Sequence, residues 1–349
     1  ALETVKYPNS IPSIPNNTFN GCTSLKNFNF SELTKLTSIG SGAFNNTGLS
    51  GSIDLSNCTK LTTIPGSFIA GTQVEEVKVP NTISTISTDA FSNTPNLKTL
   101  DLSNLTSNKL VLGSRVFSGA GFDEVDTVQP TGENADSQVG KLLLPANKEI
   151  LFSNNIFYGM PNLTKAVIGS TSTTNNNSYV ASFFSGSSKL KTIDLSKCES
   201  AAYILNGTNG SKGNAPSFNG TAINEVKVGN PGNLAATNGQ LLLPSTIESL
   251  STNSLNGMTS LTKLDLAAAT SLTTIYANIS NANISEIVLP TEQRIDMDGD
   301  SNDDVILTPA DQLVINGSIG SDAQFAANYF ANNAVTSQIA RWGNVANNA

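Results

Sequence analysis

The sequence VKYPNSIPSIPNNTF at residues 5–19 returns as VKVPNTISTISTDAF at residues 77–91, and this repetition decides the fold. The two stretches lie 72 residues apart and share one apolar skeleton. The shared positions are Val5, Pro8, Ile11, Ile14 and Phe19 in the first stretch and Val77, Pro80, Ile83, Ile86 and Phe91 in the second. A chain that repeats its apolar positions at a fixed spacing builds the same structural unit several times.

A phenylalanine marks each unit. It recurs at Phe19, Phe44, Phe68, Phe91, Phe117, Phe157, Phe184 and Phe218, and Leu255 continues the series. The first four intervals are 25, 24, 23 and 26 residues, and later intervals lengthen where loops are inserted. Such a period predicts a leucine-rich-repeat solenoid, because a single turn cannot bury its apolar face and must stack on its neighbours. Most of the 15 phenylalanines are therefore expected inside the stack.

A strand phrase of the form apolar-x-x-apolar-x-apolar accompanies the turns. It reads LKNFNF, VEEVKV, LKTLDL, LTKAVI, LKTIDL, INEVKV, LTKLDL and ISEIVL, with looser versions in LSGSIDL and FDEVDTV. These phrases predict one parallel sheet of about ten strands in an α/β horseshoe-like solenoid that is mostly strand with little helix. Alternation points Leu97, Leu100 and Leu102 toward the core and the intervening residues outward.

A longer repeat lies on top of the short one. The stretch GKLLLPANKEILFSNNIFYGMPNLTK (140–165) resembles GQLLLPSTIESLSTNSLNGMTSLTK (239–263), which indicates that a block of several turns was duplicated. Both copies carry an insertion between an E-V strand and an L-L-L-P strand, at residues 129–139 and 229–239. Two further polar segments, 169–182 and 206–217, are predicted loops. Loops on a regular scaffold are candidate binding elements, and surface decoration is the alternative.

The phrases IPNNTFNGCTSLKNF, IGSGAFNN and VKVPNTISTISTDAFSNTPNLKTLDL are similar to the BspA-like leucine-rich repeats of bacterial surface proteins. The resemblance covers residues 1–290 and departs from the family pattern where Thr, Met or Ser replaces Cys three residues after Phe. It implies a curved solenoid over residues 1–295 that begins mid-repeat. It also implies export or a lipid anchor, a surface or extracellular location, and adhesion to host or neighbouring-cell molecules. The family has no binding residues that could be carried over.

Composition and charge narrow the range of functions. Charged residues make up 13% of the chain and the net charge is −8, which argues against a nucleic-acid partner. No apolar run is long enough to span a membrane. The chain has no histidine, so Ser–His–Asp, Cys–His and histidine-based zinc sites are excluded, and we expect no enzymatic activity. Cys22, Cys58 and Cys198 share their repeat positions with Leu or Met, so we expect reduced thiols in the core.

The outward strand residues are the candidate ligand surface. Asp54, Asp101, Asp194 and Asp265 form a column in the repeats, and lysines precede three of them. Repeated alternating charge is typical of a solvated, mutually compensating face, which is also the natural ligand surface of a solenoid. The residues that we expect to contact a ligand are Glu76, Lys78, Lys98, Asp101, Lys191 and Asp194.

The segment DMDGDSNDD (296–304) follows the last repeat and could hold calcium. Asp296, Asp298 and Asp300 alternate as calcium ligands do, and Asp311 would close the site. An EF-hand is excluded, because Ser301 and Leu307 stand where that loop needs Gly and Glu; an acidic hinge is the alternative reading. Residues 321–344 are expected to form a helical cap, so residues 296–349 would be an acidic loop followed by a C-terminal helical cap.

These observations favour a monomeric, non-enzymatic binding or adhesion protein that contacts an extracellular protein or glycan through its sheet face and inserted loops. No cofactor is expected apart from the calcium site considered above. Two alternatives stay open at this point. The chain could be an inert spacer that displays another domain, or an accessory domain of a glycan-processing system.

Overall fold

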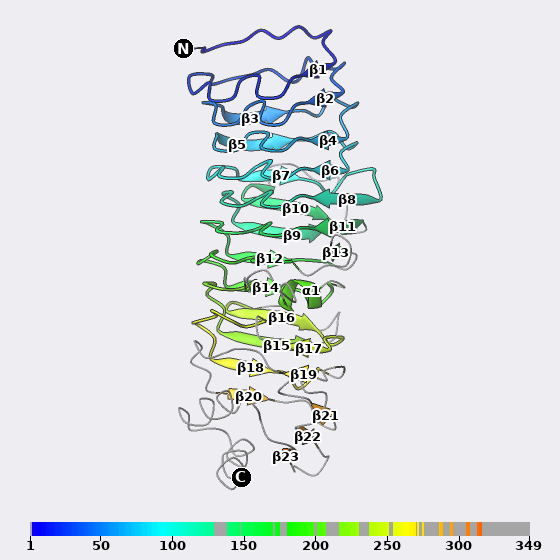
Figure 1. The fold of residues 1–349 in the computed structure, drawn as a ribbon, viewed down its shortest axis with the longest axis vertical. Coiled ribbons are helices and arrows are strands. Elements are labelled where there is room, and N and C mark those ends of the chain that lie inside the picture. Colours follow the sequence, from blue (N-terminus) through cyan, green and yellow to red (C-terminus); the bar gives the residue numbers. More distant parts are fainter. Residues whose placement is uncertain are drawn as a thin grey trace. The chain divides into compact units, whose positions relative to one another are not determined.

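The fold is seen in a computed structural model of the chain (Figure 1). It describes residues 2–128, 138–146, 148–169, 172–174, 180–198, 201–206, 216–229, 237–250, 254–269, 271, 274–275, 286–288, 294–295, 305–307 and 313–315. The chain forms two compact units, Ala1–Leu190 and Lys191–Ala349, called unit 1 and unit 2 below. The calcium candidates Asp296, Asp298, Asp300 and Asp311 and the predicted cap at 321–344 lie outside the described residues.

Unit 1 consists of stacked turns with two parallel sheets. The first sheet has the order β3 (Ser50–Asp54), β5 (Gln73–Lys78), β7 (Thr99–Asp101), β10 (Lys141–Pro145), β9 (Glu124–Val128) and β12 (Lys165–Val167). The second has the order β4 (Thr63–Ile64), β6 (Thr85–Ile86), β8 (Lys109–Leu112), β11 (Glu149–Phe152) and β13 (Ser172–Thr174). Strands β1 (Ser13–Ile14) and β2 (Ser38–Ile39) pair separately. Strand β13 lies within the predicted loop 169–182.

Unit 2 repeats the parallel arrangement. Its main strands have the order β14 (Thr192–Asp194), β16 (Gln240–Pro244), β15 (Glu225–Gly229), β18 (Lys263–Asp265) and β20 (Glu286–Val288). Strand β17 (Ser249–Leu250) pairs with β19 (Thr274–Ile275), and α1 (Ala201–Asn206) is the one helix among the described residues. An antiparallel sheet of β21 (Arg294–Ile295), β22 (Val305–Leu307) and β23 (Leu313–Ile315) was not predicted.

The prediction of a parallel, mostly stranded leucine-rich-repeat fold is confirmed. Nine of the ten strand phrases form strands of the two main sheets, and LKNFNF at residues 25–30 forms none. The expected helical cap is not tested by the described residues.

The phenylalanines stack in the interior, as the period predicts. The rings of Phe91, Phe117 and Phe157 lie nearly parallel, with successive centroids 5.8 and 5.9 Å apart. The backbone N–H of Phe91 donates to the Val116 carbonyl of the next turn, and the other turns of unit 1 are joined in the same way. One member of the predicted series is displaced, because Ile69 takes this hydrogen-bonding position and Phe68, also buried, occupies the position before it.

Each phenylalanine turn contains two residues in the left-handed backbone conformation, one two positions before the aromatic position and one two positions after it. The first column contains Asn17, Gly42, Ser67, Asp89, Arg115, Asn155 and Ser182, and the second contains Gly21, Asn46, Gly71, Asn93, Gly119, Gly159, Gly186, Gly220 and Gly257. Glycine and asparagine enter this conformation at the lowest cost, which explains why they fill the second column.

The L-L-L-P strands do not follow the order of the sequence. Strand β10 comes after β9 in the chain but lies between β7 and β9, and β16 likewise lies between β14 and β15. The two copies pair in identical register, Glu124–Val128 with Lys141–Pro145 and Glu225–Gly229 with Gln240–Pro244. The shared rearrangement supports the inferred block duplication.

Candidate ligand-binding surface

The outer face of the main sheet of unit 1 presents two rows of side chains that run across the strands. Residues with buried side chains, such as Val77, Leu100 and Val125, point inward and separate the two rows. The first row contains Ser52, Glu76, Thr99, Lys141, Glu124 and Lys165, and the second contains Asp54, Lys78, Asp101, Leu143 and Asp126. Neighbouring members of a row lie about 4.8 Å apart, which is the spacing of paired strands.

Ion pairs connect the charges on this face. Lys78 lies 3.7 Å from Glu76, and Lys141 lies 3.7 Å from Glu124 on the neighbouring strand. Lys98 does not pair with Asp101. Its ammonium group instead donates to Asp123, at 2.7 Å, at the start of β9. The face is compensated in the described region, as predicted, but its pairs join residues across neighbouring strands.

The aspartate column has a structural role that the sequence interpretation missed. Asp101 Oδ1 accepts the backbone N–H of Ser103 at 2.8 Å, and Asp194 Oδ1 accepts the N–H and hydroxyl of Ser196 at 2.9 and 2.6 Å. This is an Asx turn, in which a side-chain oxygen caps the backbone two residues ahead. The Asp-x-Ser spacing could have revealed it. One carboxylate oxygen of each aspartate is therefore already engaged at the end of its strand.

Asp54 shows how this turn affects the charge. Burial raises the pKa of Asp54, but hydrogen bonds from Ser56 and the positive charge of Lys78 outweigh that effect and hold the pKa below its usual value. At the corresponding position of an earlier turn, Asn29 accepts the Ser31 N–H at 3.0 Å without carrying a charge. The turn therefore needs the side-chain oxygen and not the negative charge.

Unit 2 contains the remaining two candidates in an equivalent setting. Lys191 is exposed, and its carbonyl accepts a hydrogen bond from Gly239 N at 2.7 Å, directly before β14 and Asp194. Glu225 pairs with Lys263 at 3.7 Å and accepts a hydrogen bond from Gln240. The six predicted residues are thus divided, with Glu76, Lys78, Lys98 and Asp101 in unit 1 and Lys191 and Asp194 in unit 2.

Leu143 and Leu242 interrupt the polar rows. Both lie at outward positions of their strands, yet their exposed fractions are 1% and 0%. Three consecutive buried leucines are typical of a parallel strand that is covered on both faces. Beside Leu143, burial raises the pKa of the Asp126 carboxyl, and Lys165 and Lys141 only partly offset this effect.

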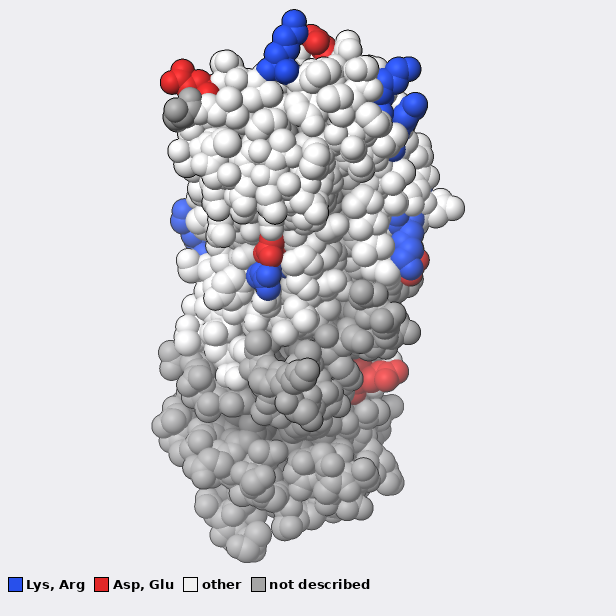
Figure 2. Space-filling model, turned by 45° about the horizontal axis from the view of Figure 1, so that its top comes forward, with Lys and Arg blue, Asp and Glu red and all other residues white. Residues whose placement is uncertain are grey.

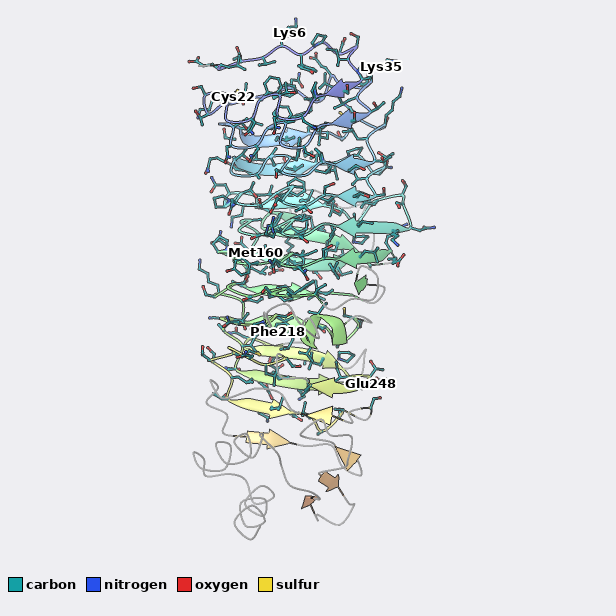
Figure 3. All side chains as sticks on the ribbon, viewed as in Figure 1. Lys6, Cys22, Lys35, Met160, Phe218 and Glu248 are labelled. Atoms are coloured by element: carbon teal, nitrogen blue, oxygen red, sulfur yellow. The ribbon has the colours of Figure 1, made fainter. Side chains whose placement is uncertain are left out.

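The core thiols are free cysteines, and two of them are buried. The Cys58 thiol donates to the Phe30 carbonyl at 3.5 Å, and burial together with the charge of Asp54 raises its pKa to about 11. Cys22 is only half-buried, near the N-terminal end of unit 1 (Figure 3), which corrects the prediction of a core position.

Buried threonines replace cysteine at the corresponding positions of other turns. The hydroxyls of Thr47 and Thr94 donate to the carbonyls of Phe44 and Phe91 at 2.9 and 2.7 Å. Thr221 donates to the Phe218 carbonyl in the same way, at 2.8 Å. The family position thus accepts threonine because the hydroxyl finds its hydrogen-bond acceptor within its own turn.

Two searches of the described residues complete the site. No three His, Cys, Asp or Glu side chains gather closely enough in that part of the chain to hold a metal ion. Helices of a length and apolar character suited to crossing a bilayer are also absent from it.

The repeat family follows from the matched sequence. Residues 1–121 match the family model of the BspA type leucine rich repeat region in six copies. Residues 1–121 are BspA-type leucine-rich repeats. The stacked turns of unit 1, with a phenylalanine inside and a parallel strand on one side, show what these BspA-type repeats build.

Solved leucine-rich-repeat structures are similar to this chain at low identity. A leucine-rich repeat protein from Bacteroides ovatus is 18% identical with a TM-score of 0.48, over 82% of this chain and 72% of that one. A leucine rich cell surface protein from Faecalibacterium prausnitzii is 13% identical with a TM-score of 0.35, over 80% and 77%. A leucine-rich repeat protein from Eubacterium ventriosum is 17% identical with a TM-score of 0.38, over 78% and 81%. No curated protein matches the chain.

Proposed function

We propose that this chain is a non-enzymatic binding protein of the cell surface or extracellular space, and that its outer sheet face contacts another protein. The observation that carries the proposal is the arrangement of charge on this face. Charged residues make up only 13% of the sequence, and Figure 2 shows a face of the molecule on which they are sparse. The outer sheet face, in contrast, places lysines and carboxylates in rows at strand spacing.

A protein partner fits this face better than a glycan. Sugar rings bind by stacking on exposed aromatic side chains as well as by hydrogen bonding. Among the described residues, the exposed large apolar side chains are Leu2, Val139 and Tyr158, and none of them belongs to a strand of the main sheet. Polar and charged groups that are held in place by neighbouring strands instead provide electrostatic complementarity to a protein surface.

The test is a binding screen against immobilised collagen, fibronectin, laminin and mucin, together with a glycan array. A variant carrying Glu76→Gln, Lys78→Gln, Lys98→Gln and Asp101→Asn removes the charge of the face. Asn at position 101 preserves the Asx turn, as Asn29 does in an earlier turn. We expect the wild-type chain to bind at least one of the four proteins and the variant to lose that binding at least tenfold.

The matched control lies on the other sheet. Lys109 and Glu149 form an ion pair of 3.5 Å between β8 and β11, so Lys109→Gln with Glu149→Gln removes charges without touching the proposed surface. Binding should survive in this control. Equal binding of the four-residue variant and the wild-type chain would show that the wrong surface has been chosen. Binding to the glycan array alone would favour the glycan alternative, and no binding at all would favour the inert spacer.

A further inference from the structure

The two sheets of unit 1 do not contain the same succession of strands. In the main sheet, β10 pairs with β7 on one side and with β9 on the other. In the second sheet, β8 pairs directly with β11. The backbone ladder of the phenylalanine turns is also continuous there, because Phe117 N donates to the Ile156 carbonyl of the next turn. One sheet has therefore gained a strand, while the rest of the turn continues without an addition.

The two ends of each insertion meet in space. Val128 at the end of β9 is the register partner of Pro145 at the end of β10, and Ala146 N donates to the Val128 carbonyl at 2.9 Å. Strand β9 could therefore continue directly into residue 146 if it moved by one strand spacing, about 4.8 Å, into the place of β10. In unit 2, Gly229 and Pro244 are register partners in the same way.

The sequence across the second insertion supports this closure. When Gly229 is joined to Ser245, the chain reads EVKVGSTIESL, which matches EVKVPNTISTI at residues 76–86 of an uninterrupted turn. Seven of these eleven letters are identical, and the match continues across the junction. The residues that flank the insertion therefore still encode one regular turn.

The inserted strands lie beside the candidate ligand residues. Leu143 of β10 is the register partner of Asp101, and Leu242 of β16 is the register partner of Asp194. Each inserted strand begins after a glycine with a positive φ, +90° at Gly140 and +94° at Gly239, where a side chain would collide with Asp123 or Asn224. The same entry geometry thus places an added strand next to the same aspartate in both blocks.

We propose that β10 and β16 are the recognition elements of the two blocks, each added to a turn that closes without it. The proposal deepens the proposed function and rests on it for the recognition role. The physical reason is that a strand that the stack does not need for closure is free to supply side chains for contact. The two strands also differ outward, with Lys141 at the position that Gln240 holds in the second block, so the two blocks present different charges.

The first experiment deletes residues 129–145, residues 230–244, or both. We expect each variant to keep its β-sheet circular dichroism and a cooperative thermal transition, because β9 then pairs with β7 and β15 with β14. Binding to immobilised collagen, fibronectin, laminin and mucin should fall in each single deletion and disappear in the double deletion.

A second variant keeps the closure testable if a deletion fails to fold. Residues 129–145 are inserted after Pro80, at the end of an uninterrupted turn, and amide hydrogen exchange is measured. Slow exchange at the transplanted KLLLP segment is expected, because it enters the sheet beside β5. Fast exchange there, together with unfolded deletion variants, would overturn the closure. A double deletion that folds and binds as wild type would overturn the recognition role while the proposed function stands, whereas a wild-type chain that binds none of the four proteins would overturn both.

Discussion

Gly159 offers a quantitative test of the left-handed column. Its φ is +61°, and a methyl group added at its Cα would meet no atom within 4 Å. The cost of Gly159→Ala therefore comes from the backbone alone, about 1–2 kcal/mol for a left-handed L-residue. The smaller conformational freedom of alanine in the unfolded chain offsets about 0.4–1 kcal/mol of this cost. We expect a net loss in the free energy of unfolding of about 1 kcal/mol.

Asparagine should restore most of that loss. Asn46 and Asn93 occupy the same position in other turns with φ of 52° and 53°, so Gly159→Asn is expected to be nearly as stable as the wild-type chain. The assay is urea unfolding followed by circular dichroism. A contrasting variant is Gly113→Ala, where the added carbon would lie 2.5 Å from Thr88 N and cause a backbone collision. We expect that variant to lose more than about 3 kcal/mol.

The outcome that contradicts the reasoning is specific. If Gly159→Asn loses as much stability as Gly159→Ala, the left-handed backbone is not the cause of the loss. If Gly159→Ala loses nothing, the column of glycine and asparagine has no energetic basis. Gly21→Ala provides a replicate, because Gly21 has a φ of +74° and similarly open space.

Three further predictions concern the core, the outer face and the C-terminal segment. Thr94→Val removes the hydroxyl that satisfies the Phe91 carbonyl and should lower the free energy of unfolding by about 1–2 kcal/mol in urea titration, whereas Thr59→Val at an exposed position should not. The pKa of Asp126 is raised by burial, so its ionisation opposes folding at neutral pH and no longer does so once the carboxyl is protonated. Asp126→Asn should therefore melt higher than the wild-type chain at pH 7 and equally at pH 3.5, and a gap that persists in acid would refute this cause. Millimolar calcium should raise the melting temperature of the wild-type chain and not that of Asp298→Ala, and the site is abandoned if the wild-type chain does not respond.

Much of the fold could be predicted because burial enforces a pattern of apolar residues that is visible in the sequence. The phenylalanine interval and the strand phrases both report which side chains face the core, and nine of the ten phrases are strands. The displacement at Phe68 and Ile69 escaped prediction, because two adjacent large apolar residues fit the interval equally well. Only the hydrogen bonds between turns decide which of them takes the common position.

The order of the strands could not be predicted from periodicity. The E-V and L-L-L-P phrases both satisfy the strand pattern, and a period gives the number of strands without their neighbours. Two signals were present in the sequence. The run Leu142–Leu144 is typical of a strand covered on both faces, and the phrase that continues across the second insertion marks that insertion as an addition.

The candidate surface was predicted in location but not in detail. The outward residues do lie on the strand face, but the pairing of Lys98 with Asp123 depends on which strand follows β7 in the sheet. The aspartates recur partly because they cap turns, as the Asp-x-Ser spacing indicates. Neither contact can be read from the spacing of charges alone.

The added strand also fixes the position of a bound partner. An unbroken ladder looks nearly the same after a shift of about 4.8 Å, so a molecule docked on it could slide between several docking positions of similar energy. Strand β10 removes this translational ambiguity, because it places a leucine between Asp101 and Asp126 where the rest of the row is charged. A scaffold made of near-identical coils thereby acquires one preferred alignment for whatever it holds.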